Sequence, residues 1–459
     1  MTKKTKGRTL SFILLLVALL SVAVMNYHAR TGTSKELNIY CWDMTFKELL
    51  AENYPAYDAE TDTIGEVKIN WVVNPDLNGT YQLELEHMLT RQNMYKSRDS
   101  IDIFLLEADF VRKYTSTDEY ALSLRELGIT EEDQARQYPY TRQAAKDAEG
   151  VERGIAYQAT PGVMLYRRDM AREIFGTDAP ENIQTEVSNW TRFEQTARRI
   201  KAADGYMLSG FFDTYRVVAN GRHAGWLRGA EITLGPELAA WVEQTLHFAD
   251  NNLTMGNELW DWSWKNSVRT RRVFCFFGPA WFIDNTFIMA SLAQPPAAGG
   301  KKAKGNGTYG LWGVCRGPQP FFWGGTWICA SKNTDNKELV ADIMRTLCCD
   351  TETARRMCYG ERLIFPNNRT VTQERADSSQ PGLDFLDGQN PYTVMVEVAE
   401  ELPDPLAQMT PYDNSMHELF CSSCSPYFRR QESWNQAWQR FLASIWMKHP
   451  DLQDAASLQ

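Results

Sequence analysis

The first part of the chain alternates short apolar runs with amphipathic stretches. Residues 37–42 and 101–106 are β-rich and mostly apolar, and residues 67–73 begin as an alternation of apolar and polar positions, so all three are predicted to be strands. Between them, residues 46–54 and 80–95 have apolar side chains at helical spacing. Strands that alternate with helices indicate a parallel sheet covered on both faces. The pattern therefore predicts an α/β fold.

Ligands of such sheets bind beyond the carboxyl ends of the strands. In this chain the predicted ends are Trp42-Asp43, Asn74 and the segment from Glu107 to Asp109. We therefore expect these residues to lie near one another and near a ligand.

The middle of the chain repeats the alternation, with more aromatic residues. Strands are predicted over 162–166 and 206–211, and helices over 169–175, 190–203, 336–349 and 434–447. Residues 226–327 hold nine of the fifteen tryptophans, and residues 295–307 have the composition of a solvated loop. The pair Arg167-Arg168 is predicted to lie on a solvated face.

The N-terminus has the layout of a secretory signal. Lys3, Lys4, Lys6 and Arg8 precede a largely apolar run over residues 10–25. The run is short for a transmembrane helix, but it could remain as an uncleaved anchor. No cysteine follows it closely, so a lipid-modified N-terminus is not expected. Residues 1–36 are thus predicted to export the chain, which is either secreted or held at the cell surface.

Length, charge and cysteine content narrow the class of protein. A chain of 459 residues is too long for one compact core and suits two lobes, or one large α/β unit with insertions. A net charge of -10 argues against a nucleic-acid partner, because phosphate binding needs a basic surface. Nine cysteines is an odd number, and the single Cys421-x-x-Cys424 is a weak metal signal. We expect no metal and no cofactor.

Aromatic residues stand beside glycine or a carboxylate at several predicted loops. The set comprises Trp42-Asp43, Glu107-x-Asp109, Tyr157-Gln158, Phe212-Asp213, Trp260-x-Trp262-x-Trp264, Gly278-Pro279-Ala280-Trp281, Trp323-Gly324-Gly325-x-Trp327 and Tyr412-Asp413. Carbohydrates need this combination, since carboxylates and amides pair with their hydroxyls and flat rings cover their C–H faces. Glycine lets the backbone approach a ligand closely.

Other interpretations of the same residues stay open. Glu107 and Asp109 could be the carboxylate pair of a glycosidase, or they could simply begin a helix, whose first turn favours acids. A tryptophan packs in a core more often than it contacts a ligand, and Trp260, Trp262 and Trp264 share one side only on a strand. A receptor of the same fold for a non-sugar ligand is a further alternative.

Taken in order, the motifs resemble those of the extracellular solute-binding proteins of ABC transporters, family 1, in the maltose-binding-like carbohydrate branch. The resemblance rests on the exported N-terminus and on Ile101-Asp102-Ile103-Phe104 followed by Glu107-x-Asp109, Tyr157-Gln158-Ala159-Thr160-Pro161-Gly162, Tyr166-Arg167-Arg168-Asp169, Phe277-Gly278-Pro279-Ala280-Trp281, Gly317-Pro318-Gln319, Phe322-Trp323-Gly324-Gly325-Thr326-Trp327, Asn336-Lys337-Glu338-Leu339 and Thr410-Pro411-Tyr412-Asp413.

The resemblance implies a two-lobe α/β fold of the type II periplasmic-binding-protein kind, with a hinge and an interlobe cleft. The N-terminal lobe would comprise residues 37–157 plus 327–375, and the C-terminal lobe residues 158–326 plus 376–459. The chain would cross between lobes near residues 157–162, near 323–331 and after Pro366. It would act as a monomer, without catalysis, and deliver a mono- or oligosaccharide to an ABC permease. The expected ligand-binding residues are Trp42, Asp43, Glu107, Asp109, Tyr157, Asp213, Trp262, Trp281, Trp323, Gly324, Gly325, Tyr412 and Asp413.

Overall fold

A computed structural model of the chain describes residues 36–75, 79–94, 100–229, 231–270, 272–405 and 408–457. The predicted signal segment therefore lies outside the described residues, apart from Glu36. Within the described ranges, no helix combines the length and the apolar character that crossing a membrane requires.

The first lobe contains a sheet of seven strands in the order β2-β3-β4-β1-β5-β14-β6. Their bounds are β1 (Glu36–Cys41), β2 (Tyr57–Asp58), β3 (Thr63–Ile64), β4 (Val67–Val73), β5 (Ile103–Leu106), β6 (Ile155–Gln158) and β14 (Thr326–Ala330). β4, β1 and β5, from which the parallel sheet is predicted, are parallel, whereas the other neighbouring strands of this sheet pair antiparallel. No helix stands between β13 (Trp312–Cys315) and β14, and helical crossovers are the usual connections between parallel strands.

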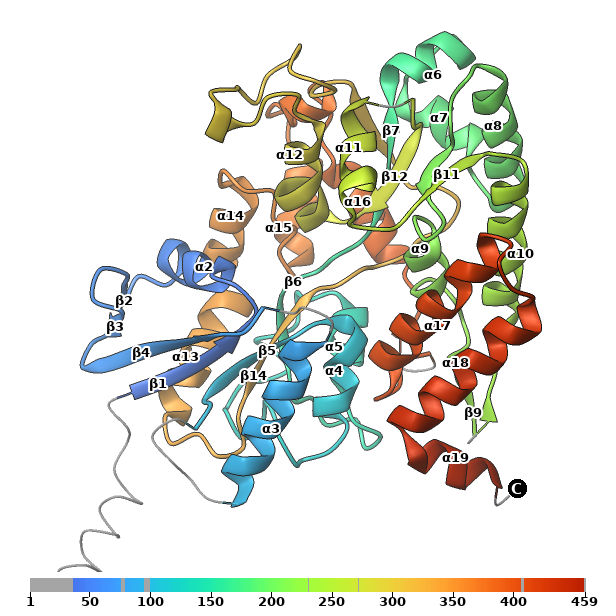
Figure 1. Cartoon of the computed structure of the whole chain (residues 1–459). Helices are drawn as coiled ribbons and strands as arrows, with labels where there is room; N and C mark the ends of the chain where they lie inside the picture. Colours follow the sequence, from blue (N-terminus) through green and yellow to red (C-terminus); the bar gives the residue numbers. More distant parts are fainter. Residues whose placement is uncertain are drawn as a thin grey trace, which may run out of the picture.

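Helices cover both faces of this sheet, as predicted (Figure 1). Leu37, Ile39 and Cys41 of β1 pack with α2 and α13, whereas Tyr40 faces Tyr81 of α3 on the other side. The alternation follows from the two-residue period of a strand. The helices of this lobe are α2 (Thr45–Asn53), α3 (Thr80–Met94), α4 (Ala108–Thr115), α5 (Pro139–Ala144), α13 (Lys337–Cys348) and α14 (Thr351–Tyr359).

The second lobe is built around an antiparallel sheet, β12-β7-β13. Its strands are β7 (Val163–Arg167), β12 (Cys275–Gly278) and β13 (Trp312–Cys315); β8 (Leu208–Gly210) and β11 (Thr254–Asn257) form a parallel pair, and β9 (Leu227–Arg228) and β10 (Glu231–Ile232) a small hairpin. The helices are α6 (Arg168–Phe175), α7 (Pro180–Glu186), α8 (Trp190–Ala202), α9 (Tyr215–Ala219), α10 (Pro236–Asp250), α11 (Trp262–Thr270) and α12 (Ile288–Ser291). Later in the chain, α15 (Arg369–Ala376) packs against both α14 and α16 (Tyr392–Glu401).

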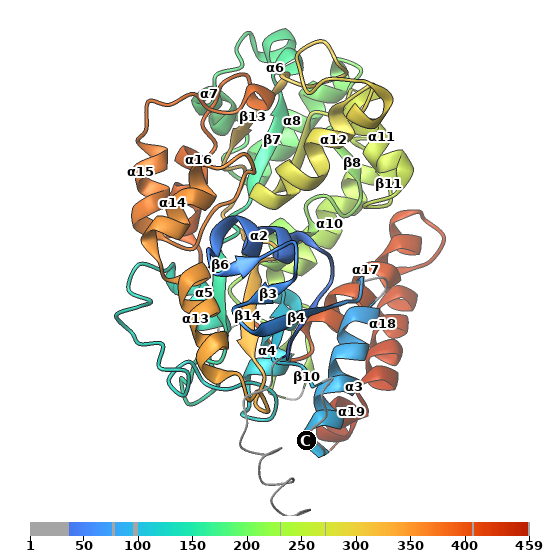
Figure 2. The ribbon, with the colours of Figure 1, turned by 90° about the vertical axis from the view of Figure 1, so that its left-hand side faces the viewer.

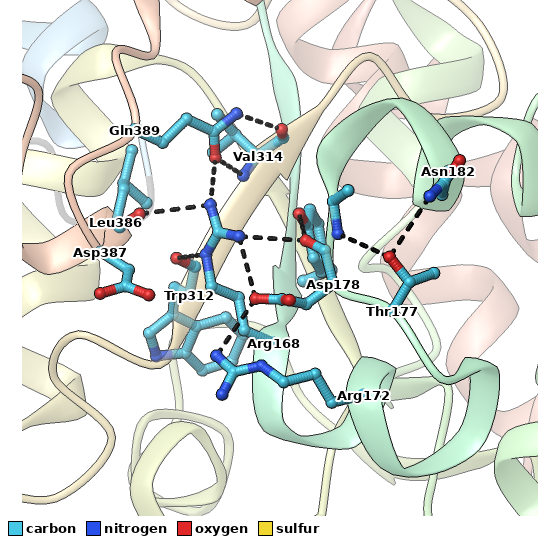
Figure 3. A network of polar contacts seen from close by, with 12 residues as sticks. Arg168, Arg172, Thr177, Asp178, Asn182, Trp312, Val314, Leu386, Asp387 and Gln389 are labelled. Carbon is cyan, nitrogen blue, oxygen red and sulfur yellow. Dashed lines mark hydrogen bonds and ion pairs between the residues drawn. The ribbon is translucent and has the colours of Figure 1, made fainter.

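Arg167 and Arg168 at the end of β7 are buried, so the prediction of a solvated face is wrong. The guanidinium of Arg168 donates hydrogen bonds to the carbonyls of Trp312, Asp178 and Leu386 and to the side chain of Gln389 (Figure 3). Several acceptors offset the cost of burying this charge. Arg168 thereby ties β13 to the loop that follows the 3-10 turn Asp384–Leu386.

Three stretches of chain lie side by side between the two sheets. The amide of Gly162 donates to the carbonyl of Phe321 at 2.8 Å, and the amide of Ala159 donates to that of Phe365 at 3.0 Å. The amide of Asn367 donates to the carbonyl of Tyr157, also at 3.0 Å. These segments include the predicted crossings near residues 157–162 and after Pro366. The lobe boundaries quoted above stay a prediction.

The chain ends in α17 (Asp413–Phe428), α18 (Trp434–Lys448) and α19 (Pro450–Ser457). α18 begins with a capping box in which Ser433 and Gln436 bond to each other's backbone amides. α17 packs against α18 and α10, and it also contacts α4 of the first lobe (Figure 2). Phe420 of α17 packs on Trp226 and Tyr215 in an aromatic core.

Candidate functional site

A cavity of about 450 Å³ lies between the two sheets and takes its walls from both lobes. It is lined by Trp42, Asp43, Thr45, Phe46, Leu105, Glu107, Phe110, Tyr157, Gln158, Trp281, Asn285, Thr286, Gly324, Gly325 and Thr326. Its size falls in the usual range for small-molecule sites. Seven of the thirteen residues predicted from the sequence therefore meet here.

The loop after β1 supplies the first wall. The ring of Trp42 is half-buried and packs edge-on against Tyr81, with 5.4 Å between ring centroids. Asp43 is exposed, and its Oδ1 accepts a hydrogen bond from the amide of Thr45 at 2.8 Å. This turn starts α2, and among the described residues the other oxygen of Asp43 accepts no hydrogen bond. One ring and one carboxylate thus face the cavity from the same turn.

Glu107 and Asp109 follow β5 but serve different purposes. Glu107 precedes the first turn of α4 and lines the cavity. Asp109 is buried elsewhere, and its two oxygens accept hydrogen bonds from the guanidinium of Arg216 at 2.7 and 2.6 Å. Glu107 is the extended N-cap residue, whereas Asp109 already belongs to the first helical turn, so the two-residue period of a strand does not continue from one to the other. The structure therefore separates the two carboxylates that the sequence places together.

The turn at Gly324-Gly325 forms the floor of the cavity. Both residues have positive φ angles, 69° and 127°, which side chains disfavour. A Cβ on Gly324 would lie 3.1 Å from Nε1 of Trp281 and 3.5 Å from Oε1 of Glu107. The missing side chain therefore allows an indole from one lobe and a carboxylate from the other to approach the same turn.

Trp281 stands over this turn. Its Nε1 donates a hydrogen bond to the carbonyl of Trp323 at 3.1 Å, and the two rings lie 5.4 Å apart. Trp323 itself is buried and packs on Trp260 at 5.6 Å, so it supports Trp281 from behind. Trp323 does not line the cavity. The stack holds the Trp281 indole in a defined orientation.

Tyr157 and Gln158, at the end of β6, also line the cavity. Nε2 of Gln158 donates to the hydroxyl of Tyr157 at 3.4 Å and to Oγ1 of Thr326 at 3.2 Å. Burial raises the pKa of Tyr157 to about 12, so the phenol is protonated at neutral pH. The three side chains provide polar groups at the back of the cavity.

The remaining predicted residues lie away from the cavity. Asp213 accepts hydrogen bonds from the amides of Ser209 and Gly210 and from the indole of Trp264. Its burial outweighs these bonds and raises its pKa to about 6. Trp262, by contrast, is 75% exposed at the start of α11. The structure brings neither of them into the cavity.

Tyr412 and Asp413 lie at the start of α17, also outside the cavity. The hydroxyl of Tyr412 donates to Asp451 at 2.5 Å. Asp413 is buried and accepts hydrogen bonds from the amide and hydroxyl of Thr410, and burial raises its pKa to about 6. Tyr412 thus joins the start of α17 to α19, and Asp413 holds the turn that precedes α17.

Sequence reasoning missed several residues of the lining, namely Thr45, Phe46, Leu105, Phe110, Asn285, Thr286 and Thr326, and it noted Gln158 without selecting it. The spacing from Trp281 could have pointed to Asn285. Trp281 caps the π-helical turn Phe282–Phe287, and Asn285 lies four residues later within that turn. Residues four apart in a helical segment share a face. The apolar members carry no comparable signal, because nothing local distinguishes them from core residues.

The lining combines rings, carboxylates, amides and hydroxyls. Trp42 and Trp281 offer flat apolar faces, and Asp43 and Glu107 offer acceptors. No lysine, arginine or histidine belongs to the described lining of this cavity. In the part of the chain that the structure describes, no group of three or more His, Cys, Asp or Glu side chains could hold a metal ion. The arrangement suits a hydroxyl-rich guest with apolar faces.

Comparison with known proteins gives a consistent result. The sequence model of a family described as bacterial extracellular solute-binding protein matches residues 60–382. None of the curated proteins matches the chain. Among solved structures, an extracellular solute-binding protein of family 1 is similar over 89% of this chain and 98% of its own, with 17% identity and a TM-score of 0.72.

Two further structures come from bifidobacteria. The galacto-N-biose/lacto-N-biose I-binding protein of the Bifidobacterium longum ABC transporter, in complex with lacto-N-biose, has a TM-score of 0.65 at 11% identity, covering 93% of this chain and 98% of its own. An ABC transporter binding protein from B. animalis subsp. lactis, in complex with beta-1,6-galactobiose, has a TM-score of 0.63 at 15% identity, covering 90% and 97%. The predicted two-lobe α/β fold is confirmed.

Proposed function

The chain belongs to the family of bacterial extracellular solute-binding proteins, and on that premise we propose that it captures a mono- or oligosaccharide for an ABC import permease. The observation that carries the proposal is the cavity between the lobes, where aromatic rings and carboxylates from distant parts of the sequence converge. The protein would work outside the cytoplasm, as its family does, and as a monomer.

The lining supplies both kinds of contact that a sugar needs. Carboxylates and amides such as Glu107 and Gln158 can each pair with neighbouring hydroxyls. The indoles of Trp42 and Trp281 can cover the C–H faces of a pyranose ring at small entropic cost, because tryptophan has only two rotatable side-chain bonds. The sugar complexes of similarly folded proteins support the same class of ligand.

Capture would proceed by closure of the two lobes. Trp42 and Glu107 belong to the first lobe and Trp281 to the second, so a sugar that contacts all three favours the closed state. Binding can shift a population only by the difference in affinity for the two states. The closed shape would then be the form that the permease recognises.

Binding without turnover is favoured over glycoside hydrolysis. Both oxygens of Asp109 accept hydrogen bonds from Arg216, so this carboxylate is not positioned beside Glu107 as an acid/base partner. The cavity therefore binds in our proposal and does not cleave.

A sugar panel tests the proposal directly. Isothermal titration calorimetry and thermal unfolding would be run with glucose, galactose, mannose and their common disaccharides. A sugar present at about 100 times its Kd should stabilise the fold by about 2.7 kcal/mol. Trp281→Ala should abolish most of this gain, whereas the matched change Trp262→Ala, outside the cavity, should preserve it. A panel in which no sugar binds would refute the proposal.

A further inference from the structure

A small branch opens from the main cavity. It has a volume of about 30 Å³ and shares five lining residues with the cavity, namely Thr45, Tyr157, Gln158, Trp281 and Asn285. A water molecule needs about 10–15 Å³ of such space, so the branch holds about two non-hydrogen atoms and not a second sugar ring. Because Trp281 borders both spaces, a sugar ring packed on its indole lies at the mouth of the branch.

The branch takes charged residues from both sides of the cleft. Arg362 follows α14 of the first lobe, and Asp284 belongs to the π-helical turn Phe282–Phe287, which leads into α12 of the second lobe. Hydrogen bonds in a π-helix join residues five apart, so successive side chains diverge less than in an α-helix, and such turns are frequent at functional sites. In this turn Asp284 and Asn285 line the branch, and Asn285 and Thr286 line the cavity.

Both charged side chains retain bonding capacity for a ligand. Within the described ranges, the guanidinium of Arg362 donates one hydrogen bond, from Nη1 to the exposed carboxylate of Glu48 at 3.1 Å, whereas a guanidinium carries five N–H donors. Burial raises the pKa of Asp284, and the amide of Leu363 and the charge of Arg362 oppose this shift. The branch thus offers a donor and an acceptor that lie close enough to influence each other.

The rest of the added lining is apolar. Leu49, Leu363 and Ile364 complete it, and all three side chains are buried. A hydroxymethyl group has matching parts, since its methylene carbon can contact apolar side chains while its hydroxyl both donates and accepts a hydrogen bond. It also has two non-hydrogen atoms, which is about the number that the branch can hold. Size and chemistry therefore favour the same group.

We propose that the branch binds the exocyclic hydroxymethyl group of a hexose whose ring lies in the main cavity, and that Arg362 and Asp284 determine this specificity. The inference rests on the proposed function, because it concerns the ligand of the same site. Arg362 donates to the hydroxyl oxygen, and the hydroxyl donates to Asp284. A pentose or a 6-deoxyhexose lacks this hydroxyl, so its binding leaves a donor and an acceptor of the protein unsatisfied. The protein therefore prefers hexoses, alone or within oligosaccharides.

Matched sugars test the inference. Calorimetry would compare glucose with xylose and with 6-deoxyglucose, and galactose with L-arabinose and with 6-deoxygalactose. Each analogue lacks either the whole hydroxymethyl group or only its hydroxyl. We expect every hexose that binds to do so at least about tenfold more tightly than its analogues. For a disaccharide with two free hydroxymethyl groups, the hydroxyl would be removed from each ring in turn, and the loss should be confined to one ring, because the branch holds one such group.

Variants then assign the effect to the two residues. Arg362→Met keeps an unbranched side chain and removes the donors, so the hexose should bind within about threefold of its 6-deoxy analogue. Asp284→Leu removes the acceptor at similar size and should act in the same way. Arg355→Met is the matched control, since Arg355 of α14 is 39% exposed, pairs with Glu352 and Glu374, and is absent from both sets of lining residues. It should preserve the ratio of the wild type.

The outcomes separate the two proposals. If a 6-deoxy analogue binds as tightly as its hexose, or if the wild-type ratio persists in both Arg362→Met and Asp284→Leu, the specificity inference is wrong and sugar capture stands. If no sugar of either kind binds, sugar capture itself fails, and the specificity inference falls with it. The comparison of analogues uses the wild-type protein, so it decides the matter even where a variant does not fold.

Discussion

Replacing Arg216 by alanine tests whether its buried ion pair with Asp109 holds the two lobes together. Arg216 of α9 and Asp109 of α4 form an ion pair with two contacts, 2.7 and 2.6 Å long. The side chain of Asp109 is only 6% exposed and that of Arg216 is 18% exposed. Arg216→Ala leaves the Asp109 carboxylate buried without its cation.

Removing one partner of a buried pair typically costs about 3–5 kcal/mol. Since Arg216 has some solvent access, water can partly replace it, and we expect about 3 kcal/mol of lost unfolding free energy. Urea denaturation, followed by tryptophan fluorescence and by circular dichroism, would measure the loss. The two probes must coincide for one free energy to be defined.

An exposed ion pair provides the matched control. Arg198 and Glu194 lie one turn apart on α8, with side chains 57% and 33% exposed. Arg198→Ala should cost no more than about 0.5 kcal/mol, as is usual for such pairs. If Arg216→Ala destabilises the protein no more than Arg198→Ala does, the buried pair does not hold the lobes together.

Further predictions concern the cleft and the buried acids. Gly324→Ala places a Cβ 3.1 Å from Nε1 of Trp281 at a positive φ, so it should cost about 1 kcal/mol in urea denaturation and weaken sugar binding in calorimetry. Met416→Ala, on the buried face of α17, should cost about 2–5 kcal/mol of unfolding free energy, and a loss below about 1 kcal/mol would show a loose core. Burial raises the pKa of Asp213 to about 6, so the folded state binds this proton more tightly than the unfolded state does. The contribution of Asp213 to the free energy of unfolding should therefore fall as pH rises from about 4 to about 6. Urea midpoints across that window should fall less steeply in Asp213→Asn than in the wild type; equal slopes would contradict the assignment.

The elements of the first lobe follow closely from local pattern. The predicted strands at 37–42, 67–73 and 101–106 correspond to β1, β4 and β5, and the predicted helix at 80–95 corresponds to α3. A strand or helix with one buried face carries its period in the sequence itself, so no distant partner is needed to recognise it.

The candidate site was predictable in part for a related reason. Trp42 and Glu107 follow strands whose parallel pairing brings their carboxyl ends to one edge of the sheet. Trp281 and Gly324 were found through composition and family resemblance, because an indole and a glycine turn are rare enough to stand out. Trp262 also stands in an aromatic-rich stretch of the sequence, but its side chain lies on the surface.

By itself, the sequence determined the α/β alternation, the chemical character of the cleft and the identity of several of its lining residues, because periodicity and composition are local properties. Only the tertiary structure decided that Glu107 faces the cavity while Asp109 bonds to Arg216, 107 positions along the chain. It likewise decided that β14 pairs antiparallel with β5, and that Trp281 lines the cavity whereas Trp262 does not. These outcomes depend on which distant residues come into contact with each side chain when the chain folds. A short stretch of sequence does not contain that information.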